Sequence, residues 1–116
     1  MKKTIDKQAF YCAVYEIVKR IPFGRVTNYG AIARAAGFPT HSRMVGVAMS
    51  SCGSYNDYVP AHRVVNSGGY LTGKDSFKHP MEMQRLLEEE GVLVRNNKVQ
   101  NFGTVFWSPV DEIEFE

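Results

Sequence analysis

The sequence contains little cysteine, no long apolar run and no repeated segment. Two cysteines, Cys12 and Cys52, are too few for a disulfide framework, and we interpret both as free thiols. Asp6 interrupts the basic start Met1–Lys3 before any apolar stretch, and no run of membrane length follows, which argues against a signal peptide and a membrane partner. We therefore expect an intracellular protein, located in the cytoplasm and associated with the nucleoid if the source is bacterial.

The composition also lacks the features of a disordered chain. Hydrophobic residues make up 44% and charged residues 22% of the 116 residues, which is typical of one soluble globular domain. The net charge of +2 hides a segregation, because residues 1–43 contain eight Lys or Arg and two acids whereas residues 44–116 contain six and ten. The basic segment is a candidate surface for phosphate groups, and a solvated helical surface is the alternative that composition alone favours.

Periodic apolar residues predict a helix near each end of the chain. Residues 6–20 carry an apolar stripe at helical spacing, with Asp6 as the N-cap and Pro22 as the stop. Pro80 is expected in the first turn of the last helix, which Gly91 terminates. The residues of that helix expected to face inward are Met83, Leu86 and Leu87.

Two shorter helices are predicted between them. Asn28 is expected to cap a helix over residues 29–36, which Gly37 ends in the left-handed conformation. Pro39 and Thr40 are expected to open the next helix, which reaches about residue 51. Two short helices joined by a glycine-containing turn are the outline of a helix-turn-helix, whose second helix approaches the DNA duplex.

The remaining segments predict loops and one hairpin. Residues 52–57 form a polar loop, and a glycine-rich loop extends from Ser67 to Gly73. Asn96-Asn97 predicts the turn of a hairpin between two short strands. The aromatic tail is expected to pack on the rest of the domain through Phe102, Phe106 and Trp107.

Five motifs resemble, in order and near-spacing, the DNA-binding domain of O6-alkylguanine-DNA alkyltransferases. They are Ile21-Pro22-Phe23-Gly24, Val26-Thr27-Asn28-Tyr29-Gly30, Ser42-Arg43-Met44-Val45-Gly46, Pro60-Ala61-His62-Arg63-Val64-Val65, and Leu86-Leu87 through Glu90-Gly91. The resemblance covers about residues 10–95, leaves residues 96–116 as a packed extension, and makes residues 1–116 one domain. It implies a mainly α fold with a small β-hairpin, a winged helix-turn-helix DNA-binding domain of the alkyltransferase type.

Three departures from that family pattern narrow the expected function. Ala61 stands where the family has its alkyl-accepting cysteine, Cys52 stands about where it has a hinge asparagine, and Lys74 replaces a pocket tyrosine. This combination resembles the alkyltransferase-like proteins, which bind O6-alkylguanine without transferring the alkyl group and mostly have tryptophan at the position of Ala61. We therefore expect a non-enzymatic sensor of DNA damage that marks the lesion for nucleotide excision repair proteins.

The resemblance implies a set of DNA-binding residues on the two short helices. Arg43 would fill the stack that the flipped base leaves and pair with the orphaned cytosine, and Tyr29 would press on a phosphate to rotate the nucleotide outward. An arginine that only contacts phosphate and a tyrosine packed under the turn are the alternatives. The helix-start N–H groups after Asn28 and Thr40 would bind phosphates. The small residues Gly46 and Ser50 would let the second helix lie close in the minor groove.

The resemblance also implies a lesion pocket, formed by Pro60, Ala61, Val64, Lys74 and Asp75. The carbonyls of Ala61 and Val64 would accept hydrogen bonds from the guanine amine, and the ammonium of Lys74 would stack on the base, although a solvent-exposed loop lysine is the alternative. Because alanine is smaller than cysteine or tryptophan, we expect this pocket to tolerate bulkier O6 adducts.

The former catalytic residues have a structural role on this hypothesis. His62 and Glu90, vestigial together with Ala61, would remain as a buried hydrogen-bonded pair, because there is no nucleophile for them to activate. Arg63 is expected to be an internal ion-pair partner. We expect no metal, no cofactor and a monomer that binds double-stranded DNA containing O6-alkylguanine. Two alternatives stay open: an active alkyltransferase that uses Cys52, and a winged-helix regulator that recognises base sequence.

Overall fold

Helix α1 (Lys7–Val18) is the centre of the larger hydrophobic core in the computed structural model, which describes residues 5–55 and 57–113. The predicted cap is confirmed, since the Asp6 carboxylate accepts a hydrogen bond from the backbone N–H of Ala9 at 3.1 Å. The helix ends two residues earlier than predicted. Val14 and Val18 on its apolar stripe are fully buried, and the helix packs against α2 and α3.

Helices α2 (Tyr29–Ala35) and α3 (Ser42–Ser50) form the predicted helix-turn-helix. Asn28 caps α2 as predicted, since its side-chain oxygen accepts a hydrogen bond from the N–H of Ala31 at 2.8 Å. Gly37 takes the predicted left-handed conformation, with a φ of 90°.

The predicted start of α3 is wrong by two residues. The N–H of His41 donates to the carbonyl of Phe38 at 2.9 Å, and this bond closes a turn with Pro39 and Thr40 at its centre. The helix therefore begins at Ser42, after His41. Thr40 does not cap it, so the free amides at its start belong to residues after His41.

Strands β1 (Thr27–Asn28) and β2 (Val64–Val65) pair in parallel, which the sequence patterns did not predict. The pairing brings Thr27 opposite Val64, so the residues before α2 lie beside the segment that begins at Pro60. A 3₁₀ turn over Ala61–Arg63 leads into β2. This contact between distant segments places Ala61 near the helix-turn-helix.

Helix α4 (Glu82–Glu89) and the hairpin of β3 (Val94–Arg95) and β4 (Lys98–Val99) surround a second, smaller core. Its buried residues are Val26, Val65, Leu71, Met83, Leu87, Val92 and Val99. The predicted hairpin turn is confirmed, with positive φ angles of 54° and 61° at Asn96 and Asn97. Gly91 terminates α4 as predicted, and its φ of 86° lies in the left-handed region.

The predicted boundaries of this region need two corrections. Pro80 lies before α4 and not in its first turn, because the N–H groups of Met81 and Glu82 are bonded to His79 and the helix starts only at Glu82. Met83 and Leu87 are buried as predicted, whereas Leu86 is only half-buried because it lines a cavity.

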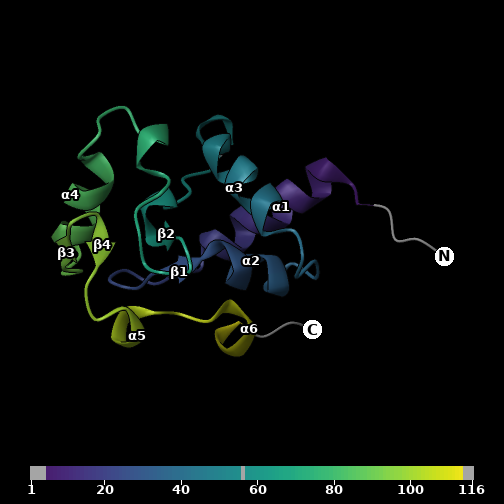
Figure 1. The fold of residues 1–116 in the computed structure, drawn as a ribbon. Helices are drawn as coiled ribbons and strands as arrows, with labels where there is room; N and C mark the ends of the chain where they lie inside the picture. Colours follow the sequence, from purple (N-terminus) through teal and green to yellow (C-terminus); the bar gives the residue numbers. More distant parts are fainter. Residues whose placement is uncertain (1–4, 56, 114–116) are drawn as a thin grey trace.

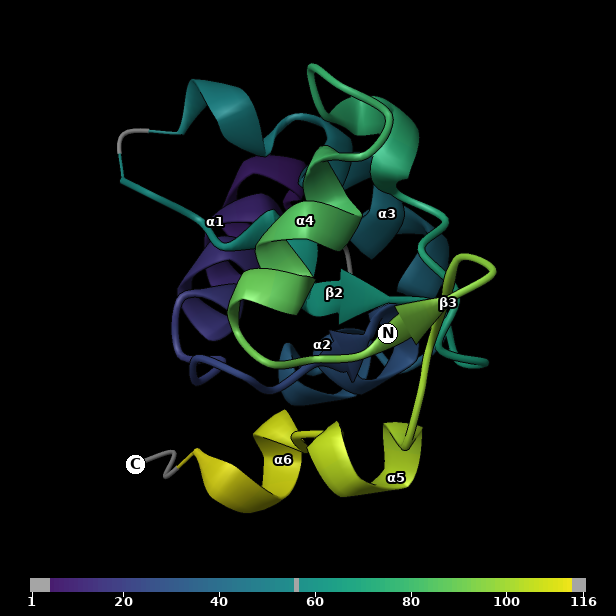
Figure 2. The same ribbon diagram turned by 90° about the vertical axis from the view of Figure 1, so that its left-hand side faces the viewer.

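The C-terminal tail carries two short helices, α5 (Phe102–Val105) and α6 (Pro109–Glu112), that were not predicted. Both lie along the side of the molecule formed by α2, and α6 contacts α2 (Figures 1 and 2). Trp107 is buried, and its backbone N–H donates to the carbonyl of Val26 at 2.7 Å. No helix of the described residues is both long and apolar enough to cross a membrane.

Candidate functional site

A cavity of about 620 Å3 lies between α3, the segment around Ala61 and the loop that precedes α4. Of the predicted site residues, it brings together Tyr29, Gly46, Ser50, Ala61, His62 and Val64. The other lining residues are Met49, Cys52, Gly53, Tyr58, Val59, Gly73, Ser76, Phe77, Lys78, Glu82 and Leu86. The helix-turn-helix and the Ala61 segment therefore share one hollow.

Three residues predicted for the lesion pocket do not line this cavity. Lys74 and Asp75 belong to a 3₁₀ turn over Lys74–Ser76, and the residues of that loop that face the hollow are Gly73 and Ser76. Residues three apart lie on the same side of a 3₁₀ turn, which leaves the two residues between them directed elsewhere. Pro60 is buried beside the lining. The predicted contacts of these three residues to a lesion stay a prediction.

Helix α3 presents an exposed face beside the cavity. Arg43 is exposed near its start, and among the described residues it makes no hydrogen bond or ion pair. A Cβ atom added at Gly46 would meet no atom within 4 Å, so the helix backbone is accessible there. Ser50 donates its hydroxyl hydrogen to the carbonyl of Val47 at 2.8 Å. This face thus combines one free guanidinium with a small residue that permits close approach.

Tyr29 lies at the edge of the cavity, at the start of α2. Its ring packs partly buried against the larger core. Its hydroxyl lies 3.5 Å from the Thr72 hydroxyl, and a Cβ at Gly73 would lie only 3.1 Å from the same oxygen. Tyr29 is therefore both a packed aromatic residue and a hydroxyl at the cavity edge, and the absence of a side chain at Gly73 makes this approach possible.

The two predicted helix-start residues differ in their availability. The side-chain oxygen of Asn28 is engaged in capping α2. Thr40 is exposed in the turn before α3, with its hydroxyl 3.2 Å from Nδ1 of His41. Their contacts to DNA stay a prediction.

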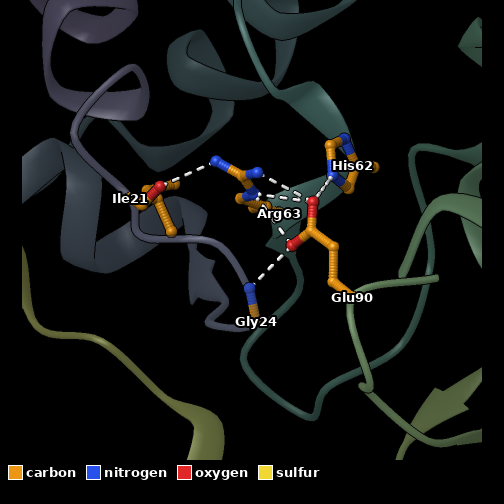
Figure 3. A network of polar contacts seen from close by, with 5 residues as sticks. All are labelled: Ile21, Gly24, His62, Arg63 and Glu90. Atoms are coloured by element: carbon orange, nitrogen blue, oxygen red, sulfur yellow. Dashed lines mark hydrogen bonds and ion pairs between the residues drawn. The ribbon is translucent and has the colours of Figure 1, made fainter. Parts of the chain in front are cut away.

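A buried polar network holds the two residues that follow Ala61, His62 and Arg63 (Figure 3). The Glu90 carboxylate accepts hydrogen bonds from His62 Nε2 at 2.6 Å, Arg63 Nη2 at 2.8 Å and the Gly24 N–H at 2.8 Å. Arg63 also donates from Nη1 to the carbonyl of Ile21 at 2.9 Å. The predicted His62–Glu90 pair and the internal ion pair of Arg63 are both confirmed.

The protonation states follow from this geometry. Burial raises the pKa of Glu90, but the hydrogen bonds from Arg63, Gly24 and His62 outweigh it and lower that pKa to about 2. Burial lowers the pKa of His62, although the Glu90 carboxylate opposes the shift. A neutral imidazole that donates from Nε2 to an ionised carboxylate leaves Nδ1 as an acceptor. The methyl group of Ala61 has no O–H or S–H group that could donate a hydrogen bond to this nitrogen.

The basic N-terminal segment offers fewer free cations than its charge suggests. Lys19 pairs with Glu16 at 3.1 Å and Asp57 at 2.8 Å, and Arg25 donates to the carbonyls of Val105 and Phe106. The other described basic residues of the segment are exposed: Lys7, Arg20, Arg34 and Arg43. Lys2 and Lys3 lie outside the described residues. The candidate phosphate surface is therefore narrower than predicted.

The two cysteines are free, as predicted, but they occupy different environments. Cys12 is exposed on α1, whereas Cys52 is half-buried and lines the cavity. Burial raises the pKa of the Cys52 thiol, which disfavours the reactive thiolate. No cluster of three metal-ligating side chains occurs within residues 5–55 and 57–113.

The model of the 6-O-methylguanine DNA methyltransferase DNA-binding domain matches residues 9–92. The chain belongs to this family. The match includes the helix-turn-helix, the Ala61 segment and α4, and thus every residue that lines the cavity. The mainly helical fold with a small hairpin is the fold expected for this methyltransferase family.

The relatives of this chain include proteins named alkyltransferase-like, DNA base-flipping and methylated-DNA–protein-cysteine methyltransferase. The chain is 38% identical over 104 residues to alkyltransferase-like protein 1 of Schizosaccharomyces pombe, covering 86% of this chain and 95% of that protein. It is 33% identical over 87 residues to a DNA base-flipping protein of Vibrio parahaemolyticus, covering 73% and 82%. A crystal structure of S. pombe Atl1 with damaged DNA containing O6-carboxymethylguanine matches with a TM-score of 0.78 and 36% identity, covering 89% of this chain and 98% of that one.

Several cavity residues were missed by sequence reasoning. Tyr58, Phe77, Lys78 and Glu82 line the cavity, yet none belongs to a motif of the methyltransferase family on which the prediction relied. The only local signal was their position on either side of the Ala61 segment and the glycine-rich loop. Their convergence depends on how α4 packs against the 3₁₀ turn over Ala61–Arg63.

Proposed function

We propose that this protein binds double-stranded DNA containing O6-alkylguanine, holds the flipped lesion in the cavity and does not transfer the alkyl group. The observation that carries the proposal is the cavity wall at Ala61. There the His62–Glu90–Arg63 network is complete, but the side chain at position 61 is a methyl group, which has no nucleophilic atom. Such a site retains a base without reacting with it.

The exposed face of α3 supports the DNA-binding part of the proposal. Arg43 is free to fill the stack vacated by the flipped base, and Gly46 lets the helix approach the minor groove. The S. pombe relative was crystallised with damaged DNA containing O6-carboxymethylguanine, which is an adduct of the proposed class.

The primary test compares three otherwise identical duplexes that contain guanine, O6-methylguanine or a labelled O6-methyl group. We expect tighter binding of the O6-methylguanine duplex and no label on the protein after prolonged incubation. Equal affinity for the modified and unmodified duplexes would refute lesion recognition. Preference that follows base sequence and ignores the lesion would instead support a sequence-reading regulator.

A second candidate, alkyl transfer to Cys52, is favoured by one observation, since this thiol lines the same cavity as Ala61. Its raised pKa counts against it. The labelled duplex separates the two candidates when it is tested with the parent protein and with Cys52→Ser. Label on the parent that Cys52→Ser abolishes would establish transfer and overturn the proposed role.

The small side chain of Ala61 extends the proposal to bulkier O6 adducts. Ala61→Trp should reduce the affinity for large O6 substituents more than the affinity for O6-methylguanine, because the indole would occupy cavity volume. An unchanged ranking of adducts in Ala61→Trp would refute this role of Ala61.

A lesion that is bound but not repaired must be removed by other proteins, and we propose that these are nucleotide excision repair proteins. Purified excision proteins should incise an O6-alkylguanine duplex faster when this protein is present. The matched control is Arg43→Ala, which should not stimulate incision. Equal incision rates with and without the parent protein would refute the coupling.

A further inference from the structure

We propose that Lys78 makes the cavity select anionic O6 substituents, such as carboxymethyl, over neutral substituents of the same shape. The inference rests on the proposed function and specifies the class of adduct that the site prefers. It is carried by one cation that lines the same cavity as Ala61 and has no partner among the described residues.

Lys78 lies in the short segment between the 3₁₀ turn over Lys74–Ser76 and the start of α4, and it lines the cavity. Within the described part of the chain, its ammonium has no hydrogen bond or ion pair. Lys74, four residues earlier, does not line the cavity. Of the two lysines on this loop, only Lys78 is therefore placed to meet the substituent of a bound base.

The other charges around the cavity offset this cation only in part. Burial lowers the pKa of His62, so its imidazole adds no charge near neutral pH. Glu82 also lines the cavity, but it is the first residue of α4, where the positive end of the helix dipole offsets part of its charge.

The rest of the wall strengthens the discrimination. Met49, Val59, Phe77 and Leu86 give part of this hollow apolar walls. The hydroxyl groups of Ser50 and Ser76 in the lining are neutral and can donate to a carboxylate and to its amide alike, so the positive charge of Lys78 is what distinguishes the two substituents. An ion pair at the mouth of an apolar cavity is less screened than one on an open surface. Because Ala61 occupies little volume, a substituent longer than methyl has room to extend from O6.

The test uses two adducts of nearly equal shape in the same duplex, O6-carboxymethylguanine and its neutral amide, O6-carbamoylmethylguanine. The measured quantity is the ratio of their dissociation constants, in which contacts to the phosphates cancel. We expect the anionic adduct to bind about two- to fivefold tighter, the range of a partly exposed ion pair, and the ratio to shrink at high salt.

The variants assign the preference to one side chain. Lys78→Met should bring the ratio to about one or below, and Lys78→Arg should retain the preference. Glu82→Gln should increase it, because a repulsive charge is removed. Lys98→Met is the matched control, since Lys98 lies on the hairpin outside the cavity lining, and it should leave the ratio unchanged.

Four outcomes would overturn the inference. They are equal binding of the two adducts by the parent protein, tighter binding of the neutral adduct, a preference that survives in Lys78→Met, and a preference that Lys74→Met abolishes while Lys78→Met does not. Failure of the proposed function is recognisable in the same experiment. In that case neither adduct duplex would bind more tightly than the duplex with unmodified guanine, which would refute both the binding of O6-alkylguanine and the preference for anionic substituents.

Discussion

The two sides of the Ala61 segment differ in how completely their polar groups are satisfied. Behind it, Glu90 accepts hydrogen bonds from His62, Arg63 and Gly24, and Arg63 is bonded further to Ile21. On the cavity side, the lining includes the unpaired cation Lys78 and the small residues Ala61 and Gly46.

This difference indicates that the network holds the Ala61 segment in place, whereas the cavity lining is available for binding. A fully bonded network behind the wall stabilises the position of the segment, while unsatisfied groups and open volume in front are available to a ligand. On the proposed function, this network still positions the segment although alanine stands where the transferases have their acceptor cysteine. Variants on the two sides should therefore affect different measurements.

The largest expected effect is the appearance of an activity. Ala61→Cys would place a thiol beside the neutral imidazole of His62, and we expect stoichiometric transfer of a labelled O6-methyl group to the protein. Repeating the incubation with the double variant Ala61→Cys, Cys52→Ser excludes Cys52 as the thiol that carries the label. Binding of the lesion without any transfer would show that the retained network cannot activate an acceptor at position 61.

The next effect concerns the folded state. Glu90→Ala leaves the guanidinium of Arg63 buried without its carboxylate, which should lower the free energy of unfolding by about 3–5 kcal/mol. Glu89→Ala is the control, because its ion pair with Arg85 is exposed and contributes about 0.3–0.5 kcal/mol. Urea denaturation measures both. Similar losses in the two variants would contradict the role of the buried network.

The pH dependence of stability should report the same carboxylate. The pKa of Glu90 falls from an ordinary value of 4.5 to about 2 on folding, so its contribution is complete above pH 4.5 and is lost as the pH falls toward 2. The shift corresponds to about 3 kcal/mol. Burial lowers the pKa of His62 as well, which adds a loss of stability in the same direction below its ordinary pKa of 6.5. Glu90→Gln should show a flatter acid limb, and an unchanged limb would count against this assignment.

On the cavity side, Arg43→Ala should reduce binding without reducing stability. We expect about a tenfold loss of affinity for the O6-methylguanine duplex, which equals about 1.4 kcal/mol, because nothing then fills the vacated stack. Arg34→Ala removes another exposed cation of the same segment and should affect damaged and intact duplexes alike. Titrations by fluorescence anisotropy distinguish the two, and equal lesion selectivity in both variants would remove Arg43 from the proposed role.

The smallest expected effect is that of Gly46→Ala, which should increase stability and decrease the affinity for DNA. Gly46→Ala should raise the free energy of unfolding by about 1 kcal/mol, since alanine is the better helix former and the added methyl group meets no atom within 4 Å. The same methyl group should weaken DNA binding, because it projects from the face that approaches the duplex. A variant that is more stable and binds DNA as tightly as the parent would show that α3 does not make this approach.

Local chemistry was sufficient to predict the ends of several elements. Asp6 and Asn28 cap helices through bonds to residues three positions away, and Gly37 adopts the predicted left-handed backbone. Gly91 ends its helix and Asn96-Asn97 form the hairpin turn, as predicted. Each of these signals acts within a few residues of the chain, so sequence reasoning can detect it.

Competition between local signals explains the misplaced helix starts. Pro39 is compatible with the first turn of a helix and with the second position of a β-turn, and the bond from His41 to Phe38 decides for the turn. Pro80 lies before α4 for a similar reason, since His79 binds the amides that follow it.

Only some of the residues that line the cavity could be predicted from the sequence. The motifs identified Ala61, Tyr29 and Gly46, which do line the cavity, but not Lys78. The parallel pairing of Thr27 with Val64 joins segments 37 positions apart, and hydrophobic periodicity along the chain does not predict such a long-range contact. Lys74 and Asp75 lie outside the lining because Gly73 and Ser76 are the residues of this 3₁₀ segment that face the hollow, and their predicted roles stay predictions.

The most direct measurement of the central claim is a single incubation of the protein with a duplex that contains one labelled O6-methylguanine, with unmodified duplex as the competitor. We predict a complex that survives a large excess of competitor and releases all of its label with the DNA after denaturation. Label that stays on the protein, or a complex that unmodified DNA displaces at equal concentration, would contradict the account.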